Sequence, residues 1–437
     1  MTDSVAIHPI HPFRASLTPP GSKSLTNRAL LLAALTEGEC TLTGVLFADD
    51  SRRMLEAMQA LGFKLDINEP ARMVRITGQG GAIPSKGASL NLGNAGTAFR
   101  FLAAACCLGE GTFTLDGIAR MRQRPIGQLV EPLRQLGADI HCTMNEGFPP
   151  LEVHGTGTLR GGELTMPPTL SSQYISALLQ IAPCCDEGLT LKFDGPITSR
   201  PYVEMTLRLM RYFGVAAEVD PAFTRIRIEK STYHNADYAI EPDASNASYF
   251  LAAAAILPNA RCTIEGLGKQ SLQGDVGFAD VLHMMGADLV FGSDFLTIIG
   301  PPANKKLRAL DIDLNRMPDM AQTLAAVALF AEGTTTIRNV GNLRVKETDR
   351  LDALRIELTK LGATVEIEGD DIAITPPEGG KLKSAAIDTY DDHRMAMSFA
   401  IIGLRSEGVT INDPACVNKT FPEYFEYLQR LRQSPMS

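Results

Sequence analysis

The sequence predicts an α/β fold made of repeats, arranged as two similar domains of three units each. Three observations predict it: a short Thr-Leu or Thr-Ile strand recurs six times, an alanine-rich helix precedes each copy, and an amphipathic helix follows. The ends of the six strand motifs are 73, 76, 73, 73 and 74 residues apart. Such near-constant spacing is typical of repeat architectures. The six copies are 40-CTL-42, 113-FTL-115, 189-LTL-191, 262-CTI-264, 335-TTI-337 and 409-VTI-411.

The helices before these strands carry almost no charge beyond their first turns, and a helix that is apolar all round is a buried helix. The clearest examples are 98–109, 247–258, 321–333 and 396–408. The segment 20–38 reads as another, with Ser22 or Ser24 as its cap and Glu37-Gly38 as its end.

The helices after these strands are amphipathic. In 349–363 a leucine stripe begins at Leu351 and ends at Leu361, and a second stripe lies in 125–138, where Pro132 should cause a kink. Each such helix should end at a left-handed glycine: Gly62, Gly137, Gly214, Gly286 or Gly362. Alternating strands follow, as in 140–155 and 364–375.

The sixth unit is cut short, because the chain ends soon after its second helix, 422–432. Its missing strands match the pattern of residues 4–21. We therefore expect one domain over 22–240 and a second over 1–21 plus 241–437, joined by two crossover strands near residues 21 and 241.

Composition restricts the possible functions. The chain has 437 residues, 45% of them hydrophobic, and a formal net charge of −9, which argues against nucleic-acid and membrane-surface binding. No apolar run approaches the roughly 20 residues that span a bilayer, and no signal peptide is evident. The eight cysteines form no C-x-x-C motif. We interpret them as reduced core residues of a cytoplasmic protein rather than as disulfides or zinc ligands.

Cations recur where the predicted helices begin, although the helix dipole disfavours positive charge there. Free N–H groups, the positive helix end and Lys or Arg side chains together suit phosphates and carboxylates. We therefore expect a polyanionic ligand in a cleft between the two domains. These cations are Lys23, Arg28, Arg124, Arg200, Lys346, Arg350, Arg394 and Lys419.

Simpler interpretations stay open for individual residues. Ser, Asn, Asp and Thr at helix starts can be ordinary caps, and 93-GNAG-96 can be a plain turn. Asp391-Asp392-His393 could belong to a metal site. Asp319 and Glu347 could be surface acids, and Tyr202 could be a packed aromatic residue.

At this point specific motifs resemble the 5-enolpyruvylshikimate-3-phosphate (EPSP) synthase family, and the resemblance covers nearly the whole chain. Its family fold has two domains of three βαβαββ units with buried parallel helices, an inside-out α/β barrel. The motifs are 20-PGSKSLTNRAL-30, 92-LGNAGTAFR-100, 121-MRQRPIG-127, 170-LSSQYISALL-179, 198-TSRPY-202, 344-RVKETDRL-351, 391-DDHRMAM-397 and 418-NKTFP-422.

The resemblance implies transfer of the enolpyruvyl group of phosphoenolpyruvate to the 5-hydroxyl of shikimate 3-phosphate, in a monomer without metal or organic cofactor. Asp319 would be the base, and Glu347, Lys23 or Lys419 would protonate the methylene carbon. The implied ligands of shikimate 3-phosphate are Lys23, Ser24, Arg28, Ser171, Ser172, Gln173, Ser199, Tyr202, Asp319, Asn342 and Lys346. Those of phosphoenolpyruvate are Lys23, Asn94, Gly96, Arg124, Gln173, Arg350, His393, Arg394 and Lys419.

The sequence departs from the family pattern at Phe101, where Pro is usual, and at Leu343, where Trp is common. Two other functions are weighed against this one. The sister transferase that acts on UDP-N-acetylglucosamine has a reactive Cys before the Arg-Pro motif, and 110–125 has none. An anion-binding protein without turnover would avoid the pair Asp319 and Glu347, since carboxylates repel its ligand.

Overall fold

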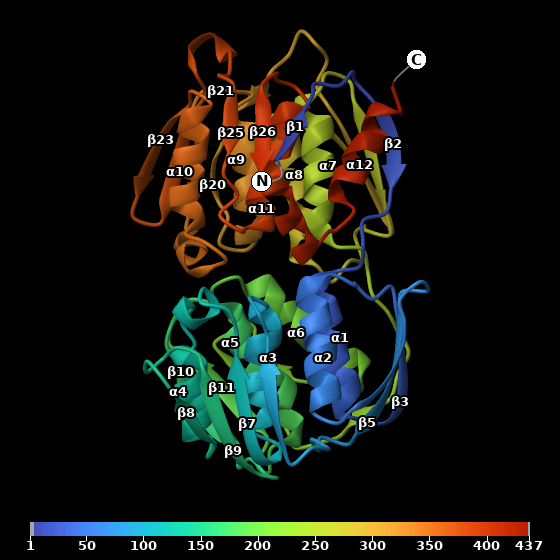
Figure 1. The fold of residues 1–437 in the computed structure, drawn as a ribbon, viewed down its shortest axis with the longest axis vertical. Helices are drawn as coiled ribbons and strands as arrows, with labels where there is room; N and C mark the ends of the chain where they lie inside the picture. Colours follow the sequence, from blue (N-terminus) through green and yellow to red (C-terminus); the bar gives the residue numbers. More distant parts are fainter. Residues whose placement is uncertain (1–3, 436–437) are drawn as a thin grey trace. The chain divides into compact units, whose positions relative to one another are not determined.

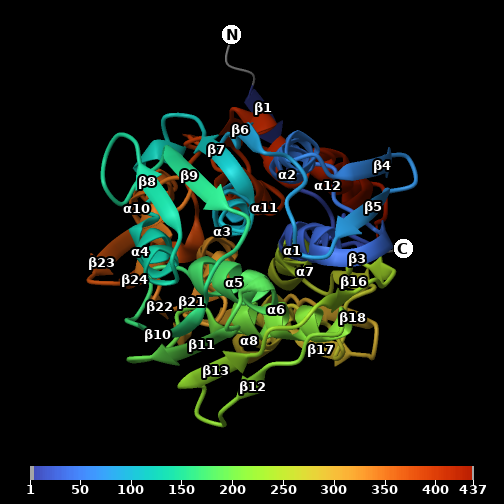
Figure 2. The ribbon, with the colours of Figure 1, turned by 90° about the horizontal axis from the view of Figure 1, so that it is seen from below.

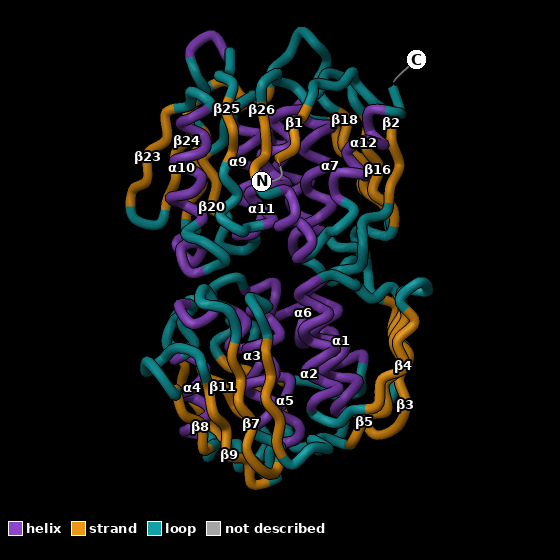
Figure 3. The backbone as a smooth tube through the Cα atoms, viewed as in Figure 1, coloured by secondary structure: helices purple, strands orange, loops and turns teal. Residues whose placement is uncertain are grey.

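The computed structural model describes residues 4–435. The chain divides into two compact units. The first unit is Gly21–Ile240, and the second unit is the chain from Glu241 onward together with the N-terminal segment up to Pro20. In both units helices lie inside and strands lie outside (Figure 3).

The first unit contains six α-helices and the strands β3 to β15 (Figure 1). The helices are α1 (Lys23–Leu35), α2 (Asp49–Ala60), α3 (Gly96–Cys106), α4 (Gly127–Gln135), α5 (Ser172–Ile181) and α6 (Arg200–Tyr212), with the 3-10 helices η1 (Met121–Gln123) and η2 (Ala182–Cys184). The strands are β3 (Thr36–Thr43), β4 (Lys64–Asn68), β5 (Met73–Gln79), β6 (Gly87–Asn91), β7 (Glu110–Asp116), β8 (Asp139–Cys142), β9 (Leu151–Thr156), β10 (Gly162–Met166), β11 (Leu189–Phe193), β12 (Glu218–Val219), β13 (Arg225–Ile228), β14 (Tyr233–His234) and β15 (Tyr238–Ala239).

The second unit contains the helices α7 to α12 and the remaining strands. Its helices are α7 (Ala244–Ile256), α8 (Phe278–Met285), α9 (Ala321–Ala328), α10 (Arg350–Lys360), α11 (His393–Gly403) and α12 (Tyr424–Arg432), with η3 (Gly274–Gly277), η4 (Pro318–Met320), η5 (Gly341–Val345), η6 (Glu378–Gly380) and η7 (Pro414–Lys419). Its strands are β1 (Ser4–Ile7), β2 (Arg14–Leu17), β16 (Arg261–Glu265), β17 (Asp288–Phe291), β18 (Phe295–Ile299), β19 (Leu307–Arg308), β20 (Asp311–Asp313), β21 (Ala331–Glu332), β22 (Thr335–Arg338), β23 (Thr364–Glu368), β24 (Asp371–Thr375), β25 (Ala385–Ile387) and β26 (Val409–Asn412).

Each unit is built on three main sheets of similar topology. The first unit has β6-β7-β9-β8, β10-β11-β13-β12 and a sheet in which β14 and β15 both pair with β3, followed by β5 and β4. The second unit has β2-β16-β18-β17, β20-β22-β24-β23 and β25-β26-β1, with a small β19-β21 pair beside them. In all six sheets the strand with the Thr-Leu or Thr-Ile motif pairs in parallel on one side and antiparallel on the other.

The α/β class and the repeat order predicted from the sequence are confirmed. All six motif strands exist, and the sheets of residues 4–435 stay separate without closing into a barrel. The five helix-ending glycines have the left-handed φ values of 88°, 102°, 87°, 114° and 96° that were expected of Gly62, Gly137, Gly214, Gly286 and Gly362. A side chain would strain these turns, so glycine sets where the helices stop.

Two predictions about particular segments are wrong. Helix α1 ends at Leu35, and Glu37-Gly38 lies within β3. Gly38 has a φ of 103°, as expected of a glycine that ends a helix, but it pairs with Gly78 in the β3–β5 ladder. It therefore lies within a strand and does not end the helix. The second error concerns residues 14–17: β1 completes the sixth sheet beside β26, but β2 instead pairs with β16 of the fourth.

The helices before the motif strands are buried side by side, as their composition predicts. Contacts join α7, α9 and α11 in the second unit. In the first unit α3 contacts α1 and α5, and these three helices lie close together in Figure 2. In the second unit, the hydroxyls of Ser248, Thr323 and Ser398 meet between the three helices, with Oγ–Oγ1 distances of 3.1 and 3.5 Å. These residues occupy equivalent positions of successive repeats, so the hydroxyls align the repeats in a dry interior. No helix of the described residues is long and apolar enough to cross a membrane.

Candidate functional site

Arg350 is the centre of a charged cluster in the second unit. Its side chain is 1% exposed, and its guanidinium donates to three carboxylates: from Nε to Asp392 at 2.7 Å, from Nη2 to Glu347 at 2.9 Å and from Nη1 to Asp319 at 3.1 Å. Burial alone would lower the pKa of this guanidinium, but Asp392, Glu347 and Asp319 raise it above its usual value. The cation is therefore permanently charged and holds three acidic side chains in fixed positions.

Asp319 joins this cluster from the start of the buried helix that η4 and α9 form. Its Oδ2 accepts from Arg394 Nη2 at 3.0 Å, and its Oδ1 lies 3.8 Å from Lys346 Nζ. Its carboxylate therefore faces three cations, counting Arg350. A carboxylate so surrounded is favoured in its ionised form, which is the form that can accept a proton.

Glu347 lies at the same place, between η5 and α10. It is buried, and besides Arg350 it faces Lys419, whose Nζ lies 3.9 Å from Glu347 Oε1. Asn342, on η5, and His393, on α11, are also buried here, and His393 Nδ1 lies 3.7 Å from Asp392 Oδ1. The structure thus brings together the predicted residues Asp319, Glu347, Lys346, Arg350, Arg394 and Lys419.

The turn before α11 holds Arg394 in place under backbone strain. Tyr390 and Asp391 both have left-handed φ values, 56° and 54°, which cost about 1–3 kcal/mol each for residues other than glycine. Asp392 then caps α11 by accepting from Arg394 N while it also binds Arg350. Burial raises the pKa of Asp391. One short segment therefore supplies both a helix cap and a buried counter-ion.

A second group of predicted residues lies at the helix starts of the first unit. Arg124 Nη1 donates to the backbone oxygen and Oδ1 of Asn94 at 3.1 and 3.0 Å. Gly96 packs against the same arginine: a Cβ there would lie 2.6 Å from Arg124 Nη2 and 2.5 Å from Arg100 Nη1. A side chain at position 96 would therefore press on both guanidinium groups and displace them from the first turn of α3.

The start of α5 meets the start of α3 at the same place. Gln173 Nε2 donates to Thr97 Oγ1 at 3.2 Å, and Ser171 caps α5 by accepting from Gln173 N. Ser172 is buried in the first turn, and Lys23, at the start of α1, lies 3.6 Å from Asp50. The helix starts thus gather several donors and cations, an arrangement suited to an anion.

Arg28 is buried like Arg124, and only 1% of it is exposed. It donates to Thr206 Oγ1, Ser176 Oγ and the backbone oxygens of Ser24 and Tyr202. Ser199, which precedes α6, has a left-handed φ of 54° that directs the chain into the helix bearing Tyr202. Three of the predicted ligands, Ser24, Arg28 and Tyr202, are thus in direct contact.

Sequence reasoning missed the partners of these residues. Asp392 was considered only as part of a metal cluster, yet it is the counter-ion of Arg350; Tyr249 was not considered, and its hydroxyl accepts from Arg394 Nη1 at 3.3 Å. Asp50 is the partner of Lys23. Asp392 lies in the motif 391-DDHRMAM-397, but the motif does not show which residue it binds, and Tyr249 and Asp50 lie in none of the quoted motifs. Among the described residues no group of three or more His, Cys, Asp or Glu is arranged to hold a metal ion.

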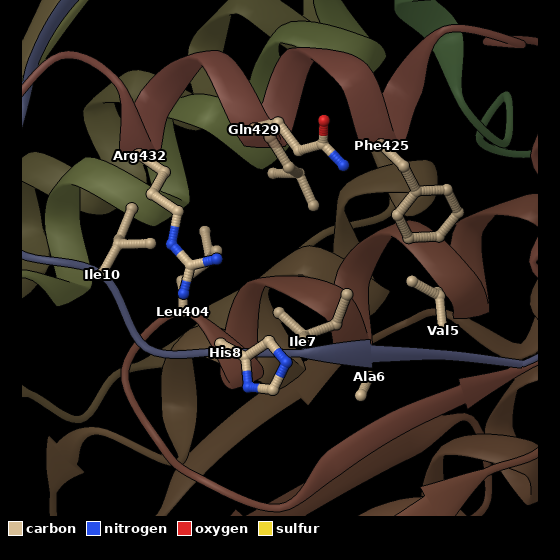
Figure 4. Close-up of a pocket in the computed structure, with 10 residues that line it drawn as sticks. Val5, Ala6, Ile7, His8, Ile10, Leu404, Phe425, Gln429 and Arg432 are labelled. Carbon is tan, nitrogen blue, oxygen red and sulfur yellow. The ribbon is translucent and has the colours of Figure 1, made fainter.

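A separate pocket of about 150 Å³ lies in the second unit between β1 and α12 (Figure 4). Ile7, Leu404 and Phe425 form part of its apolar wall, and Arg432 and Gln429 extend from α12 beside His8. Its lining contains no predicted site residue. The predicted cations and carboxylates lie in the helix-start clusters instead.

The repeated sheets and the paired cations and carboxylates at helix starts define an α/β enzyme that handles anions. The family model described as "EPSP synthase (3-phosphoshikimate 1-carboxyvinyltransferase)" matches residues 7–428. The chain therefore belongs to the EPSP synthase family.

Named relatives support this family assignment over nearly the whole length of the chain. The chain is 48% identical to the 3-phosphoshikimate 1-carboxyvinyltransferase of Aliivibrio fischeri strain ES114, over 98% of this chain and 99% of that protein. It is also 48% identical to that of Serratia proteamaculans, over 99% of this chain and all of the relative. A solved EPSP synthase from Acinetobacter baumannii has a TM-score of 0.80 at 27% identity, covering 98% of this chain and 97% of its own.

Proposed function

We propose that this protein is a transferase of the shikimate pathway that moves the enolpyruvyl group of phosphoenolpyruvate to the 5-hydroxyl of shikimate 3-phosphate and releases phosphate. The observation that carries the proposal is the family match, which extends over residues 7–428. The cluster around Arg350 supports it chemically, because it combines cations for anionic substrates with two carboxylates for proton transfer.

The residue roles are part of the proposal. Asp319 takes the proton from the 5-hydroxyl, since its three cationic neighbours favour the ionised base. Proton delivery to the methylene carbon falls to Glu347, Lys419 or Lys23. The 3.9 Å approach of Lys419 to Glu347 supports these two as a donor pair that exchanges its proton. Protonation makes the neighbouring carbon electrophilic, and the 5-hydroxyl attacks it to give a tetrahedral adduct. Loss of phosphate from that carbon and of a proton from the new methyl group then restores the carbon–carbon double bond of the transferred enolpyruvyl group.

The proposed binding residues form two sets, one for each substrate. Shikimate 3-phosphate is held by Lys23, Ser24, Arg28, Ser171, Ser172, Gln173, Ser199, Tyr202, Asp319, Asn342 and Lys346. Phosphoenolpyruvate is held by Lys23, Asn94, Gly96, Arg124, Gln173, Arg350, His393, Arg394 and Lys419. Two phosphates and two carboxylates require this many cations, because each charge must be compensated once water is excluded. Both units contribute residues to the assignment.

The burial of Cys106 and Cys107 argues against the sister reaction on UDP-N-acetylglucosamine. Burial raises the pKa of the Cys106 thiol well above its usual value and that of Cys107 to about 12, so neither is poised as a thiolate. The proposal includes a monomer acting in the cytoplasm. All eight cysteines are free, as is usual in a reducing compartment. Light scattering coupled to gel filtration measures the oligomeric state.

A phosphate-release assay tests the function. Phosphate should appear only when shikimate 3-phosphate and phosphoenolpyruvate are both present, and the carbon product should contain both skeletons by mass spectrometry. Replacing shikimate 3-phosphate with UDP-N-acetylglucosamine should give no release. Release with the sugar nucleotide alone, or binding of both substrates without any release, would overturn the proposal.

A further inference from the structure

Two arginines of this chain are equally buried, but the charge of one is balanced by carboxylates and that of the other is not. Arg28 and Arg350 are each 1% exposed. Arg350 has three carboxylate partners, and its pKa is raised. Burial lowers the pKa of Arg28 to about 10, and only the Tyr202 hydroxyl opposes that shift. The acceptors bonded to Arg28 within the described chain are all neutral. A buried cation without a counter-ion is costly to maintain.

The ring of Phe101 supplies the missing stabilisation. The guanidinium carbon of Arg28 lies over this ring, 5.1 Å from its centroid. Phe101 is fully buried on α3, so the contact is desolvated, the setting in which cation–π attraction is strongest. Arg28 lies on α1, and its hydrogen bonds reach α5 and α6. The ring therefore covers a guanidinium whose edges are held by neighbouring helices.

We propose that Phe101 is a positioning residue for substrate binding: its π face keeps the uncompensated Arg28 guanidinium ordered until an anionic substrate arrives. The proposal rests on the proposed function, in which Arg28 binds shikimate 3-phosphate. Phe101 itself does not bind the substrate. It removes the need to order the guanidinium at the moment of binding, which is how preorganisation strengthens affinity.

Fluorination separates the electrostatics of the ring from its shape. Pentafluorophenylalanine at position 101 reverses the charge distribution of the ring and keeps its outline. The dissociation constant of shikimate 3-phosphate, measured by calorimetry, should rise about 5- to 20-fold. KM for shikimate 3-phosphate should rise similarly, and kcat should change less than twofold, because the lost interaction acts in ground state and transition state alike.

Phe99 is the matched control, since it is also fully buried on α3. Fluorination there should leave the dissociation constant within twofold. Phe101→Leu should weaken binding as fluorination does, whereas Phe99→Leu should alter only thermal stability. In an Arg28→Met background, fluorination at position 101 should have no further effect on affinity. An unchanged dissociation constant after fluorination of Phe101, or an equal loss after fluorination of Phe99, would overturn the inference.

A measurement without substrate keeps this test separate from the proposed function. The thermal midpoints of the parent, Arg28→Met, fluorinated Phe101 and the combined variant form a double-mutant cycle. The two changes should be non-additive, whether or not shikimate 3-phosphate is the ligand. Additive midpoints would refute the contact. A parent that does not bind shikimate 3-phosphate would instead refute the proposed function.

Discussion

At the scale of single residues, the site is defined by how charges are paired. The motif sequences predicted which cations gather, although only Arg350 and Arg394 lie in the first turns of α-helices, whereas Lys346 and Lys419 lie at the ends of η5 and η7. They did not predict the pairing, since a motif does not show which residue its Asp392 binds, and Tyr249 lies outside the quoted motifs. Such partners depend on which helices pack together, and helix packing arises from contacts far apart in the chain.

Asp319→Asn should lower turnover about 10²- to 10⁴-fold, the size expected for loss of a general base. Shikimate 3-phosphate affinity should stay within about tenfold, because the cations around position 319 remain. Phosphate release gives the rate and calorimetry gives the affinity. Asp311→Asn is the control, since Asp311 is an exposed partner of Arg338. Full turnover in Asp319→Asn would remove this residue from catalysis.

Arg124→Lys should raise KM for phosphoenolpyruvate at least tenfold. Nη1 of Arg124 donates to both oxygens of Asn94, and a lysine has no second nitrogen that could bind an anion at the same time. The exposed Arg122, which pairs with Asp116, provides the control: Arg122→Lys should leave KM within twofold. Steady-state kinetics at saturating shikimate 3-phosphate measures both. Equal constants in the parent and Arg124→Lys would contradict the assignment.

The reactivity of Cys107 tests whether this cysteine could act as a catalytic thiolate, a role that its burial argues against. Since the pKa of Cys107 is raised to about 12, the neutral thiol dominates at every pH below that value, and at pH 8 only about one in 10⁴ is a thiolate. Iodoacetamide at pH 8 should therefore leave Cys107 unmodified in the folded protein and modify it after unfolding in urea. Peptide mass spectrometry reads the result, with the partly exposed Cys142 as an internal comparison. Rapid labelling of Cys107 in the folded protein would show that it is a reactive thiol.

At the scale of elements, a residue that caps a helix can serve a second purpose. Asp392 caps α11 and neutralises Arg350, whereas Asp349 caps α10 with a side chain that is 42% exposed. The periodicity of the sequence predicted where these helices lie and which glycines end their neighbours. It misjudged the end of α1, because Gly38 can serve equally in a turn or opposite Gly78 in a ladder. Local sequence cannot decide between those two uses.

The two caps give a stability test. Asn caps a helix as well as Asp does, so Asp349→Asn should change the free energy of unfolding by less than about 0.5 kcal/mol. Asp392→Asn keeps the cap but leaves Arg350 short of one buried counter-ion, and it should cost about 3 kcal/mol. Urea unfolding followed by circular dichroism measures both. Equal effects of the two substitutions would mean that Asp392 acts only as a cap.

At the scale of the whole molecule, three strands join sheets away from their sequence neighbours. β2 precedes α1 but pairs with β16, and β14 and β15 precede α7 but pair with β3. The repeat count predicted that the N-terminal segment belongs with the C-terminal repeats. It assigned β2 to the wrong sheet, because pattern matching of residues 4–21 to 371–389 cannot tell which edge a short strand will join.

Fragments that correspond to the two units should therefore differ in their ability to fold alone. Residues 21–240 contain every strand of their three sheets and should unfold cooperatively alone. Residues 241–435 lack β1 and β2, and with them the buried Phe13 and Ile7, each contributing about 2–5 kcal/mol. This fragment should aggregate or stay partly unfolded, and fusing residues 4–20 to it should restore a sharp transition by calorimetry. Cooperative unfolding of 241–435 alone at the midpoint of the fused form would contradict this role.

The pairing of β2 with β16 also means that β2 must wait for its partner strand while the protein is being synthesised. Residues 14–17 leave the ribosome early, but their partner strand, 261–265, is translated only after the whole first unit. At about 5–20 residues per second, the wait is roughly 12–50 s. β1 waits longer still, for residues 409–412. During that interval the nascent N-terminus has no partner strand, so slowed translation of the second half should expose it to proteases and chaperones before folding is complete.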